Sequence, residues 1–201
     1  KTAGYDVRVV LWGRKVTSAL PEVDTQLGDA AVLSIEGEGA LGRVEAWLAE
    51  ASAVIDGLLG TGLKRALEPP LSDLLDLVAG ATALGDGPLV VAVDVPTGLD
   101  ADSGRLDPHA LAADITVTFG YPKHGQMRFP GASAVGELVV EDIGLAPDLF
   151  AGPVDLATDR SVAALLPARP IDGHKGTFGR LLVVAGSIQY TGAACLAAAA
   201  A

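Results

Sequence analysis

The chain has 201 residues, in which 25 acidic residues outnumber 14 lysines and arginines and give a formal net charge of −11. So acidic a chain lacks the basic face that phosphate backbones require, and we expect no nucleic-acid partner. The single cysteine excludes an internal disulfide. No apolar run approaches the ~20 residues that span a bilayer, so we expect no membrane partner.

Short apolar runs alternate with Ala- and Leu-rich stretches through the first part of the chain. The strands that we expect there cover residues 7–12, 53–56, 89–93, 114–119 and 137–140. A helix is expected over residues 71–84, because apolar residues recur there at helical spacing behind two prolines. Strands and helices in this order build βαβ units, so the sequence predicts an α/β fold with a parallel sheet.

After residue 145 the composition shifts toward Pro, Gly, Ala and Asp, which is typical of a linker. We expect a short helix near residues 159–166, a strand at 180–185 and an Ala-rich helix that begins near residue 191. A strand that leads through a Gly/Ser turn into a helix opens a new α/β domain. One strand and one helix cannot bury a core, so we expect this domain to be incomplete and the chain, which lacks an initiator Met, to be a piece of a longer protein.

Two acidic residues stand where predicted strands end, which is where open α/β sheets bind ligands. Asp56 leads into a glycine-rich turn, and such a turn can direct backbone N–H groups toward an anion. The alternative is that the glycines only form a tight turn and that Asp56 caps the following segment. Asp94 follows five apolar residues, and a carboxylate so placed is either paired or functional.

Four segments in the first part of the chain resemble the NAD(P)H-hydrate epimerase family. They are DGLLGTG at 56–62, VDVPTGLDADSG at 93–104, ADITVTFG at 113–120 with Pro122-Lys123, and GEL at 136–138 running into DIG at 142–144. A later segment, HKGTFG at 174–179 with YTGAA at 190–194, resembles the opening of the ADP-dependent NAD(P)H-hydrate dehydratase domain. The two in tandem are similar to the bifunctional nicotinamide-nucleotide repair enzymes.

The resemblance implies a Rossmann-like sheet of the YjeF N-terminal type, with residues 1–145 forming the C-terminal part of the epimerase domain. A linker with a short helix is expected at 146–170, and the start of a ribokinase-like domain at 171–201. The implied reactions are interconversion of the R and S hydrates of NADH or NADPH at C6 and ADP-dependent dehydration of the S form. Hydrated NAD(P)H and ADP are thus the expected partners. A cytoplasmic homo-oligomer is expected.

The resemblance also implies roles for individual residues. Asp94 would be a substrate contact, and Asp56 and Thr97 would bind a potassium ion. Because a change of configuration at C6 needs a proton moved to or from oxygen or nitrogen, Asp94 is also our candidate for the catalytic acid/base. Thr97 stands where the family usually has Ser, and both residues present a hydroxyl. In the second domain, Ala193 would line the hydrated-nicotinamide site. The remaining expected substrate contacts form one loop: Gly60, Thr61, Gly62, Leu63, Lys64, Arg65 and Ala66.

Two other functions stay open at the level of the sequence. The epimerase fold also occurs as a non-catalytic scaffold module, although a scaffold has no need of Asp56, Asp94 and Thr97 together. A ribokinase-like small-molecule kinase is the reading suggested by the second domain alone. Lys123 and His124 follow a predicted strand, where they either contact substrate phosphates or are solvated loop residues.

Overall fold

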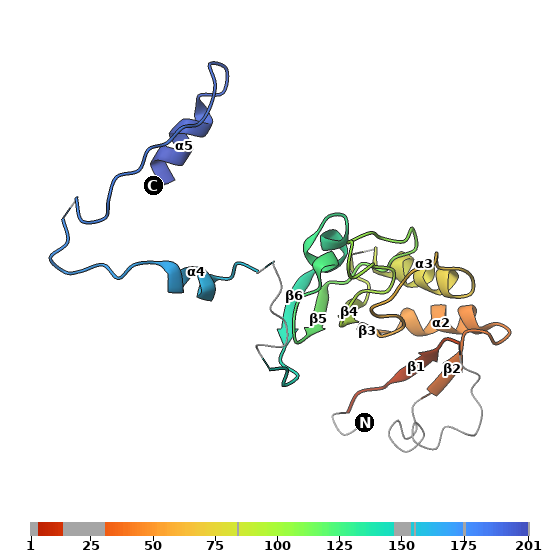
Figure 1. Cartoon of the computed structure of the whole chain (residues 1–201). Helices are drawn as coiled ribbons and strands as arrows, with labels where there is room; N and C mark the ends of the chain where they lie inside the picture. Colours follow the sequence, from red (N-terminus) through yellow and green to blue (C-terminus); the bar gives the residue numbers. More distant parts are fainter. Residues whose placement is uncertain are drawn as a thin grey trace. The chain divides into compact units, whose positions relative to one another are not determined.

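The computed structural model describes residues 4–13, 31–83, 85–146, 154, 156–174 and 176–200. The chain divides into two compact units, Lys1–Leu149 and Phe150–Ala201 (Figure 1).

The first unit contains parallel strands only. A two-stranded sheet pairs β1 (Arg8–Leu11) with β2 (Ala31–Ser34). A four-stranded sheet has the order β3-β4-β5-β6, formed by Ala53–Asp56, Leu89–Val93, Ile115–Phe119 and Glu137–Glu141. The predicted α/β fold with a parallel sheet is confirmed. Each end of these predicted strands lies within one residue of the end observed in the structure.

Two helices of the first unit, α2 (Ala40–Leu48) and α3 (Leu71–Thr82), pack on each other beside the sheet (Figure 1). In α3 the buried leucines and valine recur at helical spacing, at Leu71, Leu74, Leu75 and Val78. They contact Val90 of β4, which is fully buried. Each such aliphatic side chain contributes about 1.5–3 kcal/mol when it leaves water, so a chain poor in aromatic residues still builds a core.

A cavity of about 850 Å³ separates β1 from β3. Its walls include residues 5–10, residues 53–56 and the inner faces of α2 and α3. Among the described residues no ladder bond joins β1 to β3, so the parallel strands form a pair and a quartet rather than one continuous sheet.

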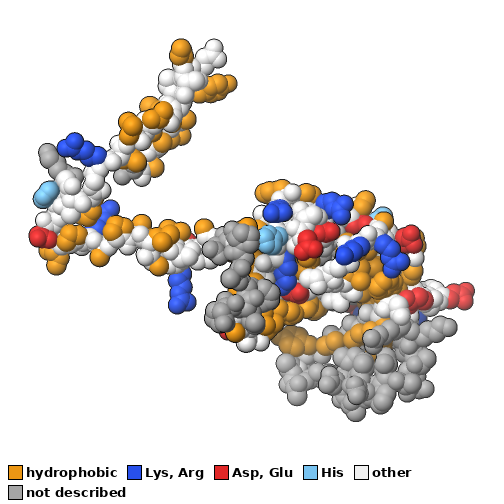
Figure 2. Space-filling model, viewed as in Figure 1, with side chains coloured by type: hydrophobic (Ala, Val, Ile, Leu, Met, Phe, Trp, Pro, Cys, Tyr) orange, Lys and Arg blue, Asp and Glu red, His pale blue; other side chains and the backbone are white. Residues whose placement is uncertain are grey.

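The second unit contains α4 (Asp159–Leu165) and α5 (Gly192–Ala200). Thr158 begins α4 with a capping box, since its hydroxyl accepts from the Ser161 amide. The described residues of this unit include no buried side chain, and Figure 2 shows apolar side chains along its surface. None of the described helices is both long and apolar enough to cross a membrane.

The strand predicted at 180–185 is wrong for this structure, because these residues form no strand. A strand is stable only when a neighbour completes its backbone hydrogen bonds, and the described part of the second unit contains no other strand. The short helix predicted before it is confirmed as α4. Much of the predicted linker, residues 147–153 and 155, lies outside the described residues.

Candidate active site

The structure brings Asp56 and Thr97 together at the carboxyl ends of β3 and β4. Asp56 is the last residue of β3, and β3 pairs with β4. The Thr97 hydroxyl donates to Asp56 Oδ1 at 2.6 Å, and the Thr97 amide donates to Asp56 Oδ2 at 2.7 Å. Asp56 is 2% exposed and Thr97 is 0% exposed. The expected convergence of these two side chains on one point is therefore present.

A third oxygen joins this pair. The Leu59 amide donates to the Thr97 hydroxyl at 3.1 Å, and the Leu59 carbonyl oxygen lies 3.4 Å from the same hydroxyl. No lysine, arginine or histidine in the described part of the chain forms an ion pair with the Asp56 carboxylate. A carboxylate, a hydroxyl and a carbonyl oxygen around one buried negative charge make a donor set suited to a hard cation.

Gly98 allows Thr97 to take this position. Its φ is +97°, a region that L side chains rarely adopt, and a Cβ there would lie 2.5 Å from Ala110 Cα. The backbone at Leu111 lies against the backbone at Thr97, where the Leu111 amide donates to the Thr97 carbonyl at 2.9 Å. The glycine of the Pro-Thr-Gly sequence is thus required by the backbone.

Asp94 directly follows β4 and is the one described non-glycine residue with positive φ, at +66°. The Val95 amide donates to the Val93 carbonyl at 2.8 Å, which makes a γ-turn centred on Asp94, a turn that is rare and strained. The turn directs the carboxylate toward the end of β5. There Asp94 Oδ1 accepts from the Phe119 amide at 2.9 Å and from the Thr118 hydroxyl at 3.2 Å.

Lys123 completes the surroundings of Asp94. Its ammonium donates to Asp94 Oδ1, to the Thr118 hydroxyl at 2.9 Å and to the Phe119 carbonyl at 3.0 Å. Burial by itself would raise the pKa of Asp94, but the hydrogen bonds from Lys123 and the Phe119 amide outweigh it and lower the pKa of Asp94 below its usual value. Asp94 is therefore a carboxylate at neutral pH.

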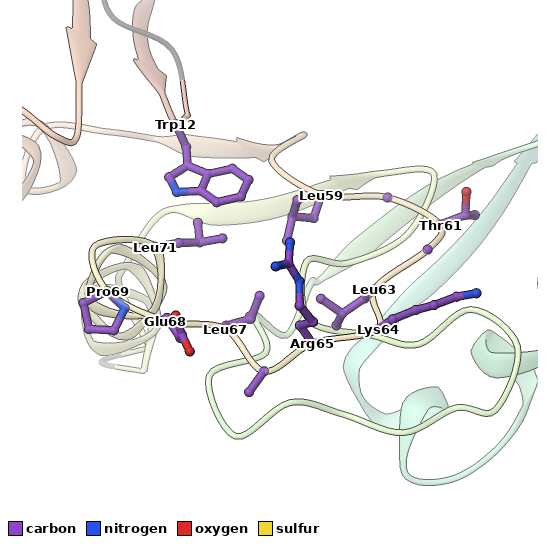
Figure 3. Close-up of a pocket in the computed structure, with 13 residues that line it drawn as sticks. Trp12, Leu59, Thr61, Leu63, Lys64, Arg65, Leu67, Glu68, Pro69 and Leu71 are labelled. Atoms are coloured by element: carbon purple, nitrogen blue, oxygen red, sulfur yellow. The ribbon is translucent and has the colours of Figure 1, made fainter.

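The loop that follows Asp56 forms one wall of a separate pocket of about 600 Å³. The whole predicted contact loop lines it: Gly60, Thr61, Gly62, Leu63, Lys64, Arg65 and Ala66. In Figure 3 the indole of Trp12 faces Leu71 and Leu59, and the Arg65 side chain rises toward the same space, whereas Lys64 points away from it. The pocket thus combines an aromatic surface with a guanidinium group.

The structure does not bring all the predicted residues into one place. Asp56 and Thr97 are joined to the 60–66 loop through Leu59, but Asp94 is not among the residues that line the loop's pocket. Ala193 lies in the first turn of α5, in the second unit, and is exposed. The roles assigned to these residues remain predictions.

Sequence reasoning missed three members of the site. Thr118 and Gln126 are 0% and 2% exposed and bond to Asp94, and Trp12 lines the pocket. For Thr118 the available signal was a polar residue one position before the end of a strand, β5. Nothing local in the sequence marks Gln126.

The family model and the curated relatives that match this chain point to one family. The model described as YjeF-related protein N-terminus matches residues 1–125. The bifunctional NAD(P)H-hydrate repair enzyme Nnr of Hyperthermus butylicus is 40% identical over 98% of this chain and 35% of its own length. The enzyme of the same name from Pyrobaculum aerophilum is 37% identical over 95% of this chain and 37% of its own length.

A solved structure shares the fold. The crystal structure of yeast ynu0 superposes with a TM-score of 0.50 at 22% identity, over 70% of this chain and 56% of that chain. The chain spans about a third of the length of the curated relatives described above.

Proposed function

The chain belongs to the family of YjeF-related N-terminal proteins, and from that membership we propose that it epimerises the hydrates of NADH and NADPH at C6. The observation that carries the proposal is its identity of 40% with a bifunctional NAD(P)H-hydrate repair enzyme over 98% of the chain. Three strand-end residues support it, because Asp56, Asp94 and Thr97 all stand at the edge where α/β sheets bind ligands.

The chemistry at C6 calls for proton transfer. C6 of the hydrate is bonded to both the ring nitrogen and a hydroxyl oxygen, so its configuration is lost either by ring opening or by departure of water. Either route moves a proton to or from oxygen or nitrogen, which is work for a positioned acid/base. Asp94 is the group we assign to it, since its carboxylate is ionised and held by donors from the end of β5.

We assign Asp56 and Thr97 to a potassium ion, with the Leu59 carbonyl as a further oxygen donor. The fit rests on the buried Asp56 carboxylate, for which the described residues supply no cationic partner. When bound, the ion would supply positive charge that offsets Asp56 and attracts the anionic groups of the substrate. The protein's own part is to hold these oxygens on two adjacent strand ends.

The loop at 60–66 is the proposed contact for the dinucleotide. Its backbone turns at Gly62, whose φ is +106°, and the Arg65 guanidinium is directed toward the pocket, whereas the Lys64 side chain points away from it (Figure 3). Phosphate groups bind well to guanidinium and ammonium donors. The Trp12 indole offers a flat surface in the same pocket (Figure 3).

The second unit belongs to the same proposal. The alignments to the relatives reach through it, and those relatives are named bifunctional. We therefore propose that residues 171–201 begin an ADP-dependent dehydratase domain in which Ala193 lines the hydrated-nicotinamide site. Residues 1–145 would form the C-terminal part of the epimerase domain, and residues 146–170 the linker. Dehydration of the S hydrate back to NAD(P)H would follow the epimerisation.

The experiment is a stereochemical assay on the complete protein. Pure R hydrate of NADPH is supplied with potassium, and chiral chromatography follows the S hydrate; ADP is then added and NADPH is measured by its absorbance. The proposal predicts S hydrate without ADP and NADPH only with it. A protein that binds the hydrate and leaves the R form unchanged would instead be a scaffold module.

A further inference from the structure

Lys123 reaches Asp94 from a different part of the chain. The two residues are 29 positions apart, and Lys123 stands just beyond β5, at the start of the 3-10 turn His124–Met127. The side chains are 20% and 25% exposed. In the described part of the chain no other side-chain ion pair involves either residue.

The Lys123 ammonium has no N–H left for another group. An ammonium carries three donors, and here they are directed at Asp94 Oδ1, the Thr118 hydroxyl and the Phe119 carbonyl. All three N–H groups of the Lys123 ammonium therefore donate to acceptors within the protein. The reading of Lys123 as a contact for substrate phosphates therefore has no support in the geometry.

Gln126 holds the same turn against the backbone of Asp94. Its side-chain oxygen accepts from the Lys123 amide at 2.7 Å, and its Nε2 donates to the Asp94 carbonyl at 2.7 Å. Gln126 is 2% exposed, so these bonds lie out of water. The segment 123–126 thus fixes both the carbonyl and the carboxylate of Asp94.

The bonds on the carboxylate are unevenly divided. Oδ1 accepts from Lys123, from Thr118 and from the Phe119 amide, whereas no bond to Oδ2 is formed by the described residues. One oxygen is therefore anchored, and the other is open to a group outside the chain.

We propose that Lys123 is a positioning residue: it anchors Oδ1 so that Asp94 stays an ionised carboxylate with Oδ2 directed at the C6 hydroxyl of the hydrate. This inference rests on the proposed function. Lys123 would not touch the substrate, and the proton would pass between the hydroxyl oxygen and Oδ2. Removing the ammonium should then affect the chemical step more than binding.

The test uses four variants of the complete protein. Lys123→Met removes the charge and keeps most of the side-chain length, Lys123→Gln is a second neutral variant in case Met does not fold, and Lys123→Arg keeps the charge. Arg43→Met removes an exposed cation of α2 and is the control. Circular dichroism checks folding, and kcat and KM are measured for R hydrate against pH.

A second readout is independent of activity. The Phe119 amide donates to Asp94 Oδ1, so its ¹⁵N–¹H resonance reports ionisation of that carboxyl group. We expect the midpoint of its titration to move to higher pH in the neutral Lys123 variants and to stay in place in Lys123→Arg and Arg43→Met. The acidic limb of kcat should move the same way, and kcat should fall by about tenfold or more with KM nearly unchanged.

The outcomes separate the two proposals. An active wild-type protein whose neutral Lys123 variants keep the midpoint and kcat would overturn this inference and leave the epimerase function standing. A rise in KM at unchanged kcat would overturn it in favour of a phosphate contact. A wild-type protein that leaves R hydrate unconverted, while the Phe119 titration still responds to Lys123, would refute the function and, with it, the catalytic part of the inference.

Discussion

At Thr97 a single hydroxyl contacts two residues of the site, Asp56 and Leu59. It donates to Asp56, accepts from the Leu59 amide and lies against the Leu59 carbonyl. Valine has nearly the same shape and lacks the oxygen, whereas serine keeps the oxygen and loses a methyl group. Thr97→Val and Thr97→Ser therefore distinguish the role of the Thr97 oxygen from that of its methyl group.

We predict that Thr97→Val raises the potassium concentration needed for half-maximal epimerisation, because one oxygen donor is lost, and that Thr97→Ser leaves it within about twofold of wild type. Activity is measured across a potassium titration, with sodium holding ionic strength constant. Equal potassium dependence in the two variants would remove Thr97 from the cation site.

Gly98 gives a prediction about stability. An added methyl group would lie 2.5 Å from Ala110 Cα, and the residue would keep a φ of +97°. We expect Gly98→Ala to lower the free energy of unfolding by more than about 2 kcal/mol, since backbone strain and overpacking add. Urea unfolding measures this, with Gly42→Ala on α2 as the control, because a Cβ at Gly42 meets nothing within 4 Å. A loss no greater than in the control would show that the turn can relax.

At the scale of elements, α3 is tied to the loop after Thr97 by His109 and Asp76. His109 Nδ1 lies 2.9 Å from Asp76 Oδ1, and the hydrogen bond to Asp76 raises the pKa of His109 above its usual value, with Asp107 and Asp73 acting in the same direction. A raised pKa means that the folded protein binds this proton more tightly than the unfolded chain. The stabilisation is complete below the unfolded pKa and disappears as the pH rises through the folded pKa.

We predict that Asp76→Asn lowers the unfolding midpoint in urea more at about pH 5.5 than at about pH 8, because the bond from protonated His109 to Asp76 weakens as the histidine loses its proton. Asp86→Asn, an exposed position, is the control and should show no such pH dependence. A difference that grows with rising pH would contradict the assignment of the proton to His109.

The elements that the sequence predicts well are those with a long uniform pattern. The apolar run of β4 and the helical spacing of α3 both indicate their structure locally. Helix α2 carries the same signal, with Ala40, Val44 and Leu48 buried at a spacing of four, although it is not among the elements predicted from the sequence. The strand expected at 180–185 failed because strand formation depends on a neighbour that a local pattern does not contain.

In the candidate site, too, the residues marked by a local pattern could be predicted, and the contacts that depend on tertiary pairing could not. Asp56 and Asp94 could be predicted because one ends and the other directly follows an apolar run typical of a strand. Thr97 was indicated only by the resemblance to the epimerase family. The contact between Asp94 and Lys123 depends on the pairing of β4 with β5, which brings together residues 29 positions apart. Tertiary pairing of this kind leaves no trace in local spacing.

At the scale of the whole molecule, the two units differ in how much apolar surface they bury. The first unit has a core in which Leu71, Val90 and Leu111 are at most 2% exposed. In the second unit Leu182, Val184, Ile188 and Leu196 are 70% exposed or more. Apolar side chains so exposed contribute nothing to stability and favour association with other surfaces.

We predict that hydrogen exchange in the 201-residue chain protects β4 and β5 strongly and α5 weakly, because no residue of α5 that the structure describes is buried. The measurement is repeated at several protein concentrations, so that association is recognised. Strong protection of residues 181–200 in a monomer would show that this unit folds by itself.

The central claim is that Asp94 moves the proton that inverts C6. The most direct measurement is the rate of conversion of R to S hydrate by the complete protein and by its Asp94→Asn variant, with Asp86→Asn as the control at an exposed position. Asparagine also tolerates positive φ, so the fold should persist, and the account predicts that the variant's kcat falls by about 100-fold or more while the control keeps its rate. Conversion by a folded Asp94→Asn protein at a rate close to that of wild type would contradict the account.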